Sequence, residues 1–168
     1  LPYALSSANS INIGRLAPQV MYYFRAYRDL MDTGKIQLGD EVNFSVPTGN
    51  FGDILAGYLA KLLGLPVGKL ICASNANNVL TDFIRTGTYD RMRPLYKTNS
   101  PSMDILVSSN LERLLYLLSG DCQLVASLME KLSKEGSYTV PEALLKDIQE
   151  QFWADYCDDA AAEAVIGR

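Results

Sequence analysis

Apolar side chains recur at helical spacing in the first part of the chain. They lie three or four residues apart along one face, at Leu16, Val20, Tyr23, Phe24, Tyr27, Leu30 and Met31. This period predicts a helix over about residues 11–33, and Gly34 is a suitable stop. Pro18 has no backbone N–H, so a kink is expected within residues 14–18.

Two short apolar runs follow, and each is succeeded by a polar loop and a helical pattern. Strands are predicted at residues 41–46 and 69–73, and helices at residues 54–63 and 79–86. The run at 69–73 shows no polar alternation, which is typical of a strand buried on both faces. Because β-α-β crossovers are right-handed, the strands should be parallel, and both polar loops should lie at the carboxyl edge of one sheet.

The rest of the chain is irregular at first and then mainly helical. A short strand is expected at residues 94–96, within a long loop. Helical patterns follow a capping box at residues 109–112 and follow Asp121. A third runs from residue 139 to about Trp153, and a last one begins at residue 160.

These elements predict an α/β fold, with a partial parallel sheet and flanking helices followed by a helical C-terminal part. We divide the chain into a β-α-β-α core (residues 1–88), a long loop (89–108) and a helical extension (109–168). Two parallel strands make a poor sheet by themselves. We therefore expect residues 1–168 to be a piece of a larger domain.

Composition narrows the classes of protein that the chain can represent. Its 168 residues are 48% hydrophobic and 20% charged, which is ordinary for a soluble globular domain. The net charge of −4 argues against a nucleic-acid partner, and no apolar run approaches the length of a membrane span. We therefore expect neither a nucleic acid nor a membrane as partner.

Histidine is absent, which removes the commonest general base and the commonest metal ligand. Triad hydrolysis and histidine–zinc catalysis are therefore not expected of this chain alone. The three cysteines, Cys72, Cys122 and Cys157, do not stand at metal-ligand spacing, so no metal site is predicted. Their number and placement favour a reducing, cytoplasmic setting.

The loop at residues 45–53, Ser-Val-Pro-Thr-Gly-Asn-Phe-Gly-Asp, joins the first predicted strand to its helix. A loop in this place presents free backbone N–H groups at a helix N-terminus, where the helix dipole favours anions and above all phosphate. Gly49 and Gly52 allow the backbone to approach a ligand closely. The pattern therefore predicts anion binding by backbone amides.

Four motifs, in their order and spacing, resemble threonine synthase. They are residues 7–15 (Ser-Ala-Asn-Ser-Ile-Asn-Ile-Gly-Arg), the loop at 45–53, residues 64–66 (Gly-Leu-Pro) and residues 73–78 (Ala-Ser-Asn-Ala-Asn-Asn). The resemblance implies the tryptophan-synthase-β-like fold and the cofactor pyridoxal 5'-phosphate. It also implies the conversion of O-phospho-L-homoserine and water into L-threonine and phosphate.

In that family a lysine from an earlier segment forms the Schiff base with the cofactor, and a later segment completes the pocket for the cofactor ring. None of the lysines of this chain stands in the family's lysine motif; they are Lys35, Lys61, Lys69, Lys97, Lys131, Lys134 and Lys146. The resemblance therefore implies no catalytic residue in this chain, and we expect the chain alone to be inactive.

The resemblance also assigns candidate binding residues. It implies that the cofactor phosphate is bound by Thr48, Gly49, Asn50, Phe51, Gly52 and Asp53. A carboxylate beside a phosphate is unfavourable, so we expect the Asp53 side chain to face away and only its N–H to contribute. Thr48 is expected to add a hydroxyl.

Two further polar groups have both a structural and a functional interpretation. The first group is Ser10, Asn12 and Arg15. In the structural interpretation these residues cap a helix and form hydrogen bonds, and in the functional interpretation they contact the substrate near its phosphate. The second group is Asn75, Asn77 and Asn78. These residues would either cap the helix predicted at residues 79–86 or line the floor of the active site.

Two other hypotheses remain. The chain could belong to another pyridoxal-phosphate lyase of the same fold, such as a hydroxy-amino-acid dehydratase or a sulfhydrylase. It could also be a catalytically inactive phosphate-binding or interaction module that keeps the fold as a scaffold. A homodimer is open in either case, since the leucine-rich stripe over residues 111–132 suits a core or a subunit contact.

Overall fold

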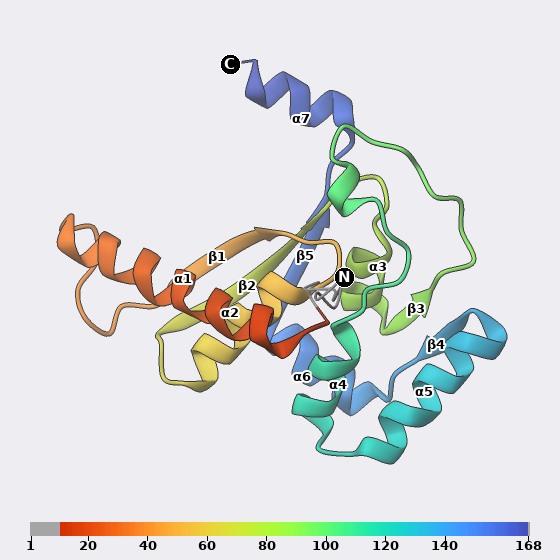
Figure 1. Ribbon diagram of the computed structural model, residues 1–168. Coiled ribbons are helices and arrows are strands. Elements are labelled where there is room, and N and C mark those ends of the chain that lie inside the picture. Colours follow the sequence, from red (N-terminus) through yellow and green to blue (C-terminus); the bar gives the residue numbers. More distant parts are fainter. Residues whose placement is uncertain (1–10, 168) are drawn as a thin grey trace, which may run out of the picture.

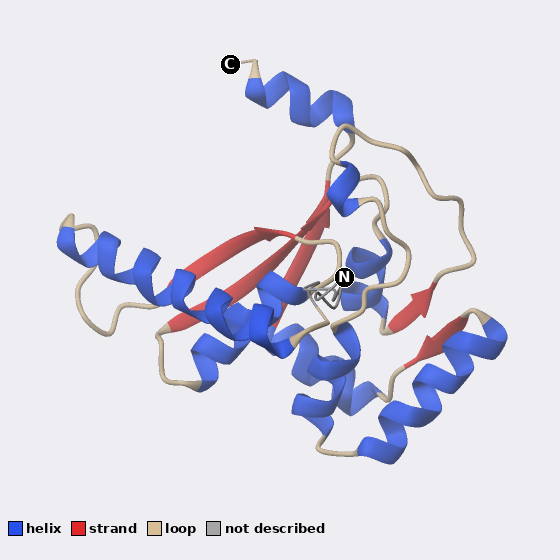
Figure 2. Ribbon diagram, viewed as in Figure 1, coloured by secondary structure: helices blue, strands red, loops and turns tan. Residues whose placement is uncertain are grey.

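The computed structural model describes residues 11–167. Within them helices and strands alternate, and the strands of the main sheet run side by side (Figures 1 and 2). The elements, in chain order, are α1 (Ile13–Asp32), β1 (Val42–Pro47), α2 (Gly52–Leu62), β2 (Val67–Ser74), α3 (Val79–Thr86), β3 (Thr88–Asp90), the 3₁₀ turn η1 (Pro101–Met103), α4 (Leu111–Ser119), α5 (Cys122–Glu135), β4 (Ser137–Thr139), α6 (Glu142–Gln151), β5 (Phe152–Tyr156) and α7 (Asp159–Ile166).

The β-α-β-α unit forms as the periodicity predicts. Strands β1 and β2 pair in parallel, and α2 and α3 follow them. Pro18 lies inside α1 without ending it, and Gly34, with φ of 68°, follows the helix end. The carboxyl ends of β1 and β2 therefore lie at one edge of the sheet, where the loop at residues 48–51 begins.

A third parallel strand corrects the prediction of an all-helical C-terminal stretch. The helix expected to reach Trp153 ends at Gln151, and β5 follows it and pairs in parallel with β2. Along β5, Phe152 and Ala154 are buried whereas Trp153 is exposed. This alternation spans only one short strand, so the strong helical period of α6 hides it in the sequence.

A two-stranded antiparallel ribbon replaces the strand expected at residues 94–96. That stretch forms no strand, and β3 pairs instead with β4. The rings of Tyr89 and Tyr138 stack across this ribbon with centroids 5.4 Å apart and planes at 4°. The prediction failed because β3 and β4 are three residues each, and their pairing rather than their own composition defines them.

The sheet is buried on one face, which corrects the prediction that β2 is covered on both. Leu70 and Cys72 are fully buried, and their neighbours across the sheet, Phe152 and Ala154, are buried too. On the opposite face Lys69 is exposed and Ile71 is only partly buried. The helices that contact β2 within residues 11–167, namely α2, α3 and α6, therefore cover the Leu70 face.

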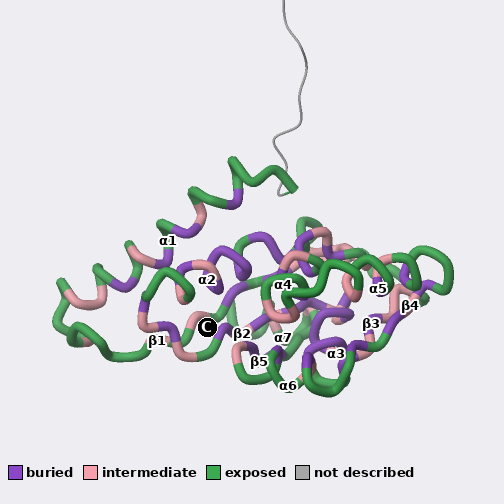
Figure 3. Tube along the Cα trace, turned by 90° about the horizontal axis from the view of Figure 1, so that it is seen from below, coloured by how far each residue is buried: buried purple, intermediate pink, exposed green. Residues whose placement is uncertain are grey.

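Helix α1 packs on α2 through one face, so buried and exposed stretches alternate along it (Figure 3). Gly57 of α2 makes this close approach possible. A Cβ atom at that position would lie 2.7 Å from Cε1 of Tyr23 and 2.9 Å from Cδ2 of Leu70. A side chain there would force the two helices or the sheet apart.

Replacement of Phe152 tests the third strand. We expect Phe152→Ala to lower the free energy of unfolding by about 3–5 kcal/mol, because it leaves a cavity beneath α2. Trp153→Ala, the adjacent position on the exposed face, should cost far less. Both values are measured by urea unfolding, and equal losses at the two positions would contradict the one-faced sheet.

Candidate functional site

The loop between β1 and α2 turns on a residue in an unusual backbone conformation. Phe51, the residue before α2, has φ of 65° and ψ of 4°, in the left-handed region. A non-glycine residue there is strained by about 1–2 kcal/mol. Phe51 is only 1% exposed, and the centroid of its ring lies 5.6 Å from the centroid of the Phe152 ring. Burial of the ring thus holds the backbone in a conformation that it would not adopt alone.

Several backbone donors of this loop are left open. Within residues 11–167, the N–H groups of Gly49, Phe51 and Asp53 have no hydrogen-bond acceptor. Two neighbouring N–H groups are used: Thr48 N donates to Ala73 O at 2.8 Å, and Gly52 N donates to Asn50 Oδ1 at 3.0 Å. Open amides at the N-terminus of an 11-residue helix form an arrangement that fits a phosphate dianion.

The carbonyl side of the loop is held by residues that sequence reasoning missed. Ser108 Oγ donates to Gly49 O at 2.8 Å. Both the backbone N and the side-chain Nδ2 of Asn110 donate to Asn50 O, each at 3.1 Å. Ser108 and Asn110 are buried, at 7% and 0% exposure. Their sequence signals are the polar run at residues 108–110 before α4 and, for Asn110, the predicted capping box at residues 109–112.

The same loop is packed against η1, and this contact explains Gly49. A Cβ atom at Gly49 would lie 3.2 Å from both Met103 Cα and Ser102 O. Two backbone segments therefore approach each other with no room for a side chain.

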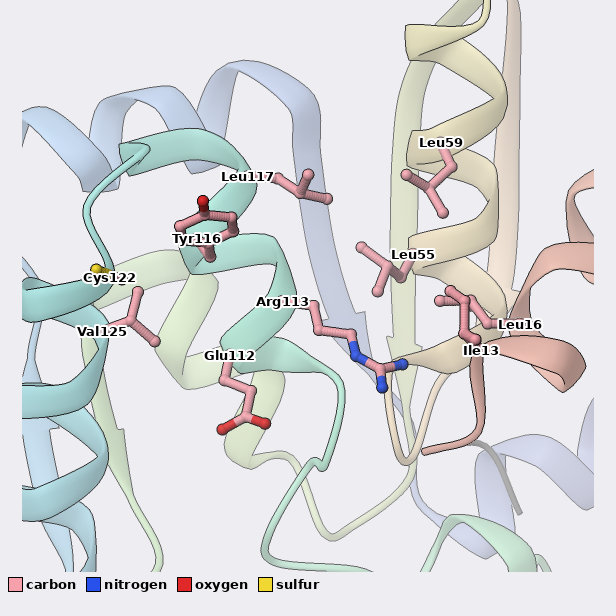
Figure 4. Close-up of a pocket in the computed structure, with 10 residues that line it drawn as sticks. All are labelled: Ile13, Leu16, Leu55, Leu59, Glu112, Arg113, Tyr116, Leu117, Cys122 and Val125. Atoms are coloured by element: carbon pink, nitrogen blue, oxygen red, sulfur yellow. The ribbon is translucent and has the colours of Figure 1, made fainter. Parts of the chain in front are cut away.

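Arg113 joins this region to the segment before α1. Its Nη1 donates to Asn110 Oδ1 at 2.8 Å, and its Nη2 donates to the carbonyl of Ile11. Figure 4 shows the guanidinium of Arg113 reaching from α4 toward the residues that precede α1. The motifs at residues 7–15 and 45–53, distant in the sequence, are thereby connected through α4.

Comparison with known proteins gives this geometry a context. The chain is 52% identical over 164 residues to threonine synthase-like 1 of Homo sapiens, covering 96% of this chain and 22% of that protein. It is 44% identical over 165 residues to threonine synthase of Eremothecium gossypii, covering 92% of this chain and 31% of that protein. No protein-family model matches the chain.

Solved structures give the same result for the fold. A pyridoxal-phosphate-bound threonine synthase from Brucella melitensis superposes with a TM-score of 0.88 and 44% identity. The match covers 98% of this chain. The chain is homologous to the threonine synthases. It spans between a fifth and a third of the curated relatives, and 35% of the Brucella chain.

Homology to the threonine synthases also confirms the predicted fold class, an α/β fold with a parallel sheet. The yeast threonine synthase structure agrees, with a TM-score of 0.87 at 35% identity.

The hydroxyl of Thr48 is already engaged. Thr48 is buried, and its Oγ1 donates to Val46 O at 2.6 Å. Only the lone pairs of this oxygen remain, and lone pairs are repelled by a phosphate oxygen. In this geometry Thr48 contributes to the shape of the loop and not a donor to an anion.

The side chain of Asp53 lies beside α1. Tyr23 OH donates to Asp53 O at 2.9 Å and to Asp53 Oδ1 at 3.4 Å. Loss of hydration through burial raises the pKa of Asp53, and the hydrogen bond from Tyr23 partly offsets this effect. Burial, together with the nearby Asp53, raises the pKa of Tyr23, so its hydroxyl stays a neutral donor.

The first candidate substrate group is only partly described. Ser10 lies outside the described residues. Asn12 caps α1, because its Oδ1 accepts a hydrogen bond from Gly14 N at 2.8 Å. Asn12 and Arg15 line the same cavity of about 580 Å³, together with Gln19 and Tyr22. Asn12 therefore caps α1 and also lines the cavity, so the structural and the functional interpretation are compatible at this helix end.

The second candidate group makes no capping hydrogen bond to α3. Asn78 stands at the N-cap of α3 without a capping hydrogen bond, and Asn75 and Asn77 bind Asp104. Asp104 also accepts hydrogen bonds from the backbone N of Thr98 at 2.9 Å and from its Oγ1 at 2.8 Å. These hydrogen bonds hold the pKa of Asp104 below its usual value. The asparagines thus fasten the long loop onto the carboxyl edge of the sheet.

One apolar cavity lies beside the segment that holds the loop. An apolar cavity of about 440 Å³ opens between α1, α2, α4 and α5, with Arg113 and Glu112 as its charged members (Figure 4). Within residues 11–167 no three acidic, histidine or cysteine side chains gather closely enough to bind a metal ion. No helix in this range combines the length and apolar character that crossing a bilayer needs.

The raised pKa of Asp53 predicts a pH effect on stability. A folded-state pKa above the unfolded value means that folding favours the protonated carboxyl. The stabilising contribution is therefore present at low pH and is lost as the pH rises from about 4 through the raised folded-state pKa. We expect Asp53→Asn to gain stability relative to the wild type as the pH rises from about 3 to about 7.

Urea unfolding at several pH values measures this gain. Asp90→Asn is a matched control, since the Asp90 carboxylate accepts one local hydrogen bond, from Met92 N at 2.7 Å. A gain of equal size in both variants would contradict a specific effect at Asp53.

Proposed function

We propose that this chain supplies the phosphate anchor of a pyridoxal-phosphate-dependent threonine synthase, in which O-phospho-L-homoserine and water yield L-threonine and phosphate. One observation carries the proposal: the open amides of Gly49, Phe51 and Asp53 at the start of α2, in a chain 44% identical to a pyridoxal-phosphate-bound threonine synthase. A cup of backbone amides is suited to the phosphate of that cofactor.

The residues of this chain would position the cofactor and take no part in bond making. When bound, the cofactor supplies an electron sink for carbanionic chemistry on the amino acid. The N–H groups of Gly49, Phe51 and Asp53 would hold its phosphate, and Asn50 and Gly52 complete the loop. The buried ring of Phe51 would keep the amides in place without ligand, so that binding costs little reorganisation.

Ser10, Asn12 and Arg15 are proposed to contact the phosphate of the substrate. The cavity that Asn12 and Arg15 line supports this role, as does the planar guanidinium of arginine, which matches phosphate oxygens in pairs. A cytoplasmic location and a homodimer remain predictions of the sequence.

A charge change in the cup tests the anchor. Asn50→Asp keeps the size of the side chain and an oxygen that can accept from Gly52 N, but it adds a negative charge beside the ligand. We expect inorganic phosphate and pyridoxal phosphate to bind at least about tenfold more weakly, since like charges a few ångströms apart repel by on the order of 1–3 kcal/mol. Isothermal titration calorimetry at low salt measures both affinities.

Asn43→Asp is the matched control, because Asn43 is exposed near the start of β1 and its Oδ1 accepts from Lys69 N at 2.6 Å. The same change of charge occurs there at the opposite end of the strand. Equal weakening in the two variants would indicate a general charge effect and would count against the loop as the binding site.

An assay of threonine formation distinguishes catalysis from binding of the cofactor or phosphate. We expect residues 1–168 alone to produce no threonine from O-phospho-L-homoserine and pyridoxal phosphate, because no lysine here stands in the family's Schiff-base motif. The complete protein that carries this chain should produce it. A coupled phosphate-release assay with threonine detection measures both, and threonine formation by residues 1–168 alone would refute the expectation.

The same assay addresses the alternatives. Relatives of 50–52% identity carry the name threonine synthase-like 1, which states no reaction. Phosphate binding without turnover by the complete protein would favour an inactive phosphate-binding module. Release of a keto acid from a hydroxy amino acid, or formation of a thiol product from sulfide, would favour a dehydratase or a sulfhydrylase of the same fold.

A further inference from the structure

We propose that Ser108 and Asn110 are positioning residues for the anion cup, the open N–H groups of Gly49, Phe51 and Asp53: by binding the carbonyls of Gly49 and Asn50, they fix the two peptide planes on either side of Asn50 and so direct the open N–H of Phe51 toward the ligand. The proposal rests on the proposed function, since it concerns how the same loop is prepared for phosphate. Neither residue belongs to the loop or to the four motifs that resemble threonine synthase.

The geometry of the peptide bond carries the argument. In a planar trans peptide, the C=O of one residue and the N–H of the next point in opposite directions. Asn50 O is bound by Asn110, so the N–H of Phe51 must point away from Asn110. Gly49 O is bound by Ser108, so the N–H of Asn50 must point away from Ser108. Fixing a carbonyl on one side of the loop thus fixes a donor on the other.

The opposite peptide orientation would be harmful in this place. If the Asn50–Phe51 peptide rotated by half a turn, its carbonyl oxygen would face a phosphate, which repels it. Residues such as Asn50 and Phe51, placed between two glycines, have the freedom to exchange orientations unless something holds the plane. Two donors hold this plane, the backbone and side-chain N–H groups of Asn110, and the hydroxyl of Ser108 holds the preceding plane between Gly49 and Asn50.

These donors are themselves held rigidly. Arg113 Nη1 donates to Asn110 Oδ1 at 2.8 Å, which sets the orientation of the amide so that Nδ2 faces Asn50 O. Ser108 N donates to Tyr89 OH at 2.9 Å, and Tyr89 OH donates to Leu106 O at 3.0 Å. Loss of the Ser108 hydroxyl leaves Gly49 O without its donor from the protein, and loss of Nδ2 leaves Asn50 O with the backbone N–H of Asn110 alone.

Two substitutions test the role. Ser108→Ala removes the donor to Gly49 O. Asn110→Asp keeps the backbone N–H and the oxygen that accepts from Arg113, but it replaces Nδ2 with an oxygen that repels Asn50 O. Thr81→Val is the control, since Thr81 is fully buried and its hydroxyl donates to a backbone carbonyl, Asp155 O at 3.2 Å, that takes no part in the cup.

The readouts are the affinity for inorganic phosphate, from calorimetry, and the ¹H–¹⁵N shift of the Phe51 amide during phosphate titration. Folding is checked by circular dichroism and urea unfolding. We expect both variants to bind phosphate about tenfold more weakly and to lose most of the shift at Phe51. Thr81→Val should lose comparable stability and bind phosphate within about twofold of the wild type.

The outcomes separate this proposal from the proposed function. If the wild type shifts Phe51 on phosphate binding and both variants retain its affinity, Ser108 and Asn110 are structural only and the positioning role is wrong. If Thr81→Val weakens phosphate as much as they do, the effect is general destabilisation, and the role is again wrong. If wild-type phosphate binding leaves Phe51 unshifted, the anion cup itself fails, and the proposed function fails with it.

Discussion

The structure depends on the contact between the rings of Phe51 and Phe152. The buried ring of Phe51 is what holds its backbone in the left-handed region, and the ring of Phe152 lies against it. Without that contact the strained backbone at the turn from β1 into α2 would lose the burial of its side chain that offsets the strain. This aromatic contact supports the start of the helix, and the hydrogen bonds from Ser108 and Asn110 hold the carbonyls of the loop before it.

That contact joins the two halves of the chain. Phe51 belongs to the β-α-β-α unit, whereas Phe152 opens β5, after all of α4, α5 and α6. The segment at residues 108–110 makes a second connection to the same loop from another direction. The proposed anion cup therefore depends on contacts from both halves of the described fold, although every donor in it comes from a single short loop.

The sequence predicted the elements that have a regular pattern of apolar residues, and it did not predict a short strand or individual side-chain contacts to the backbone. Periodicity over many residues located α1, β1, α2, β2 and α3, and the residues of the loop suggested their own chemistry. Strand β5 was missed because Phe152 and Ala154 give a single alternation, too short to stand out beside the helical period before it. Ser108 and Asn110 were missed for a different reason. They bind backbone carbonyls, which every residue has, so the sequence does not indicate which carbonyl a distant side chain will bind.

The order of the strands has a consequence for how the protein comes to be folded. Strand β2 pairs with β1 from the preceding part of the chain and with β5 from the far end. Pairings between distant segments close large loops and form slowly. During synthesis from the N-terminus, residues 45–53 leave the ribosome long before Phe152 exists to support them. A phosphate-bearing ligand would then recognise only chains that have finished folding, and its binding would draw late intermediates toward the native state.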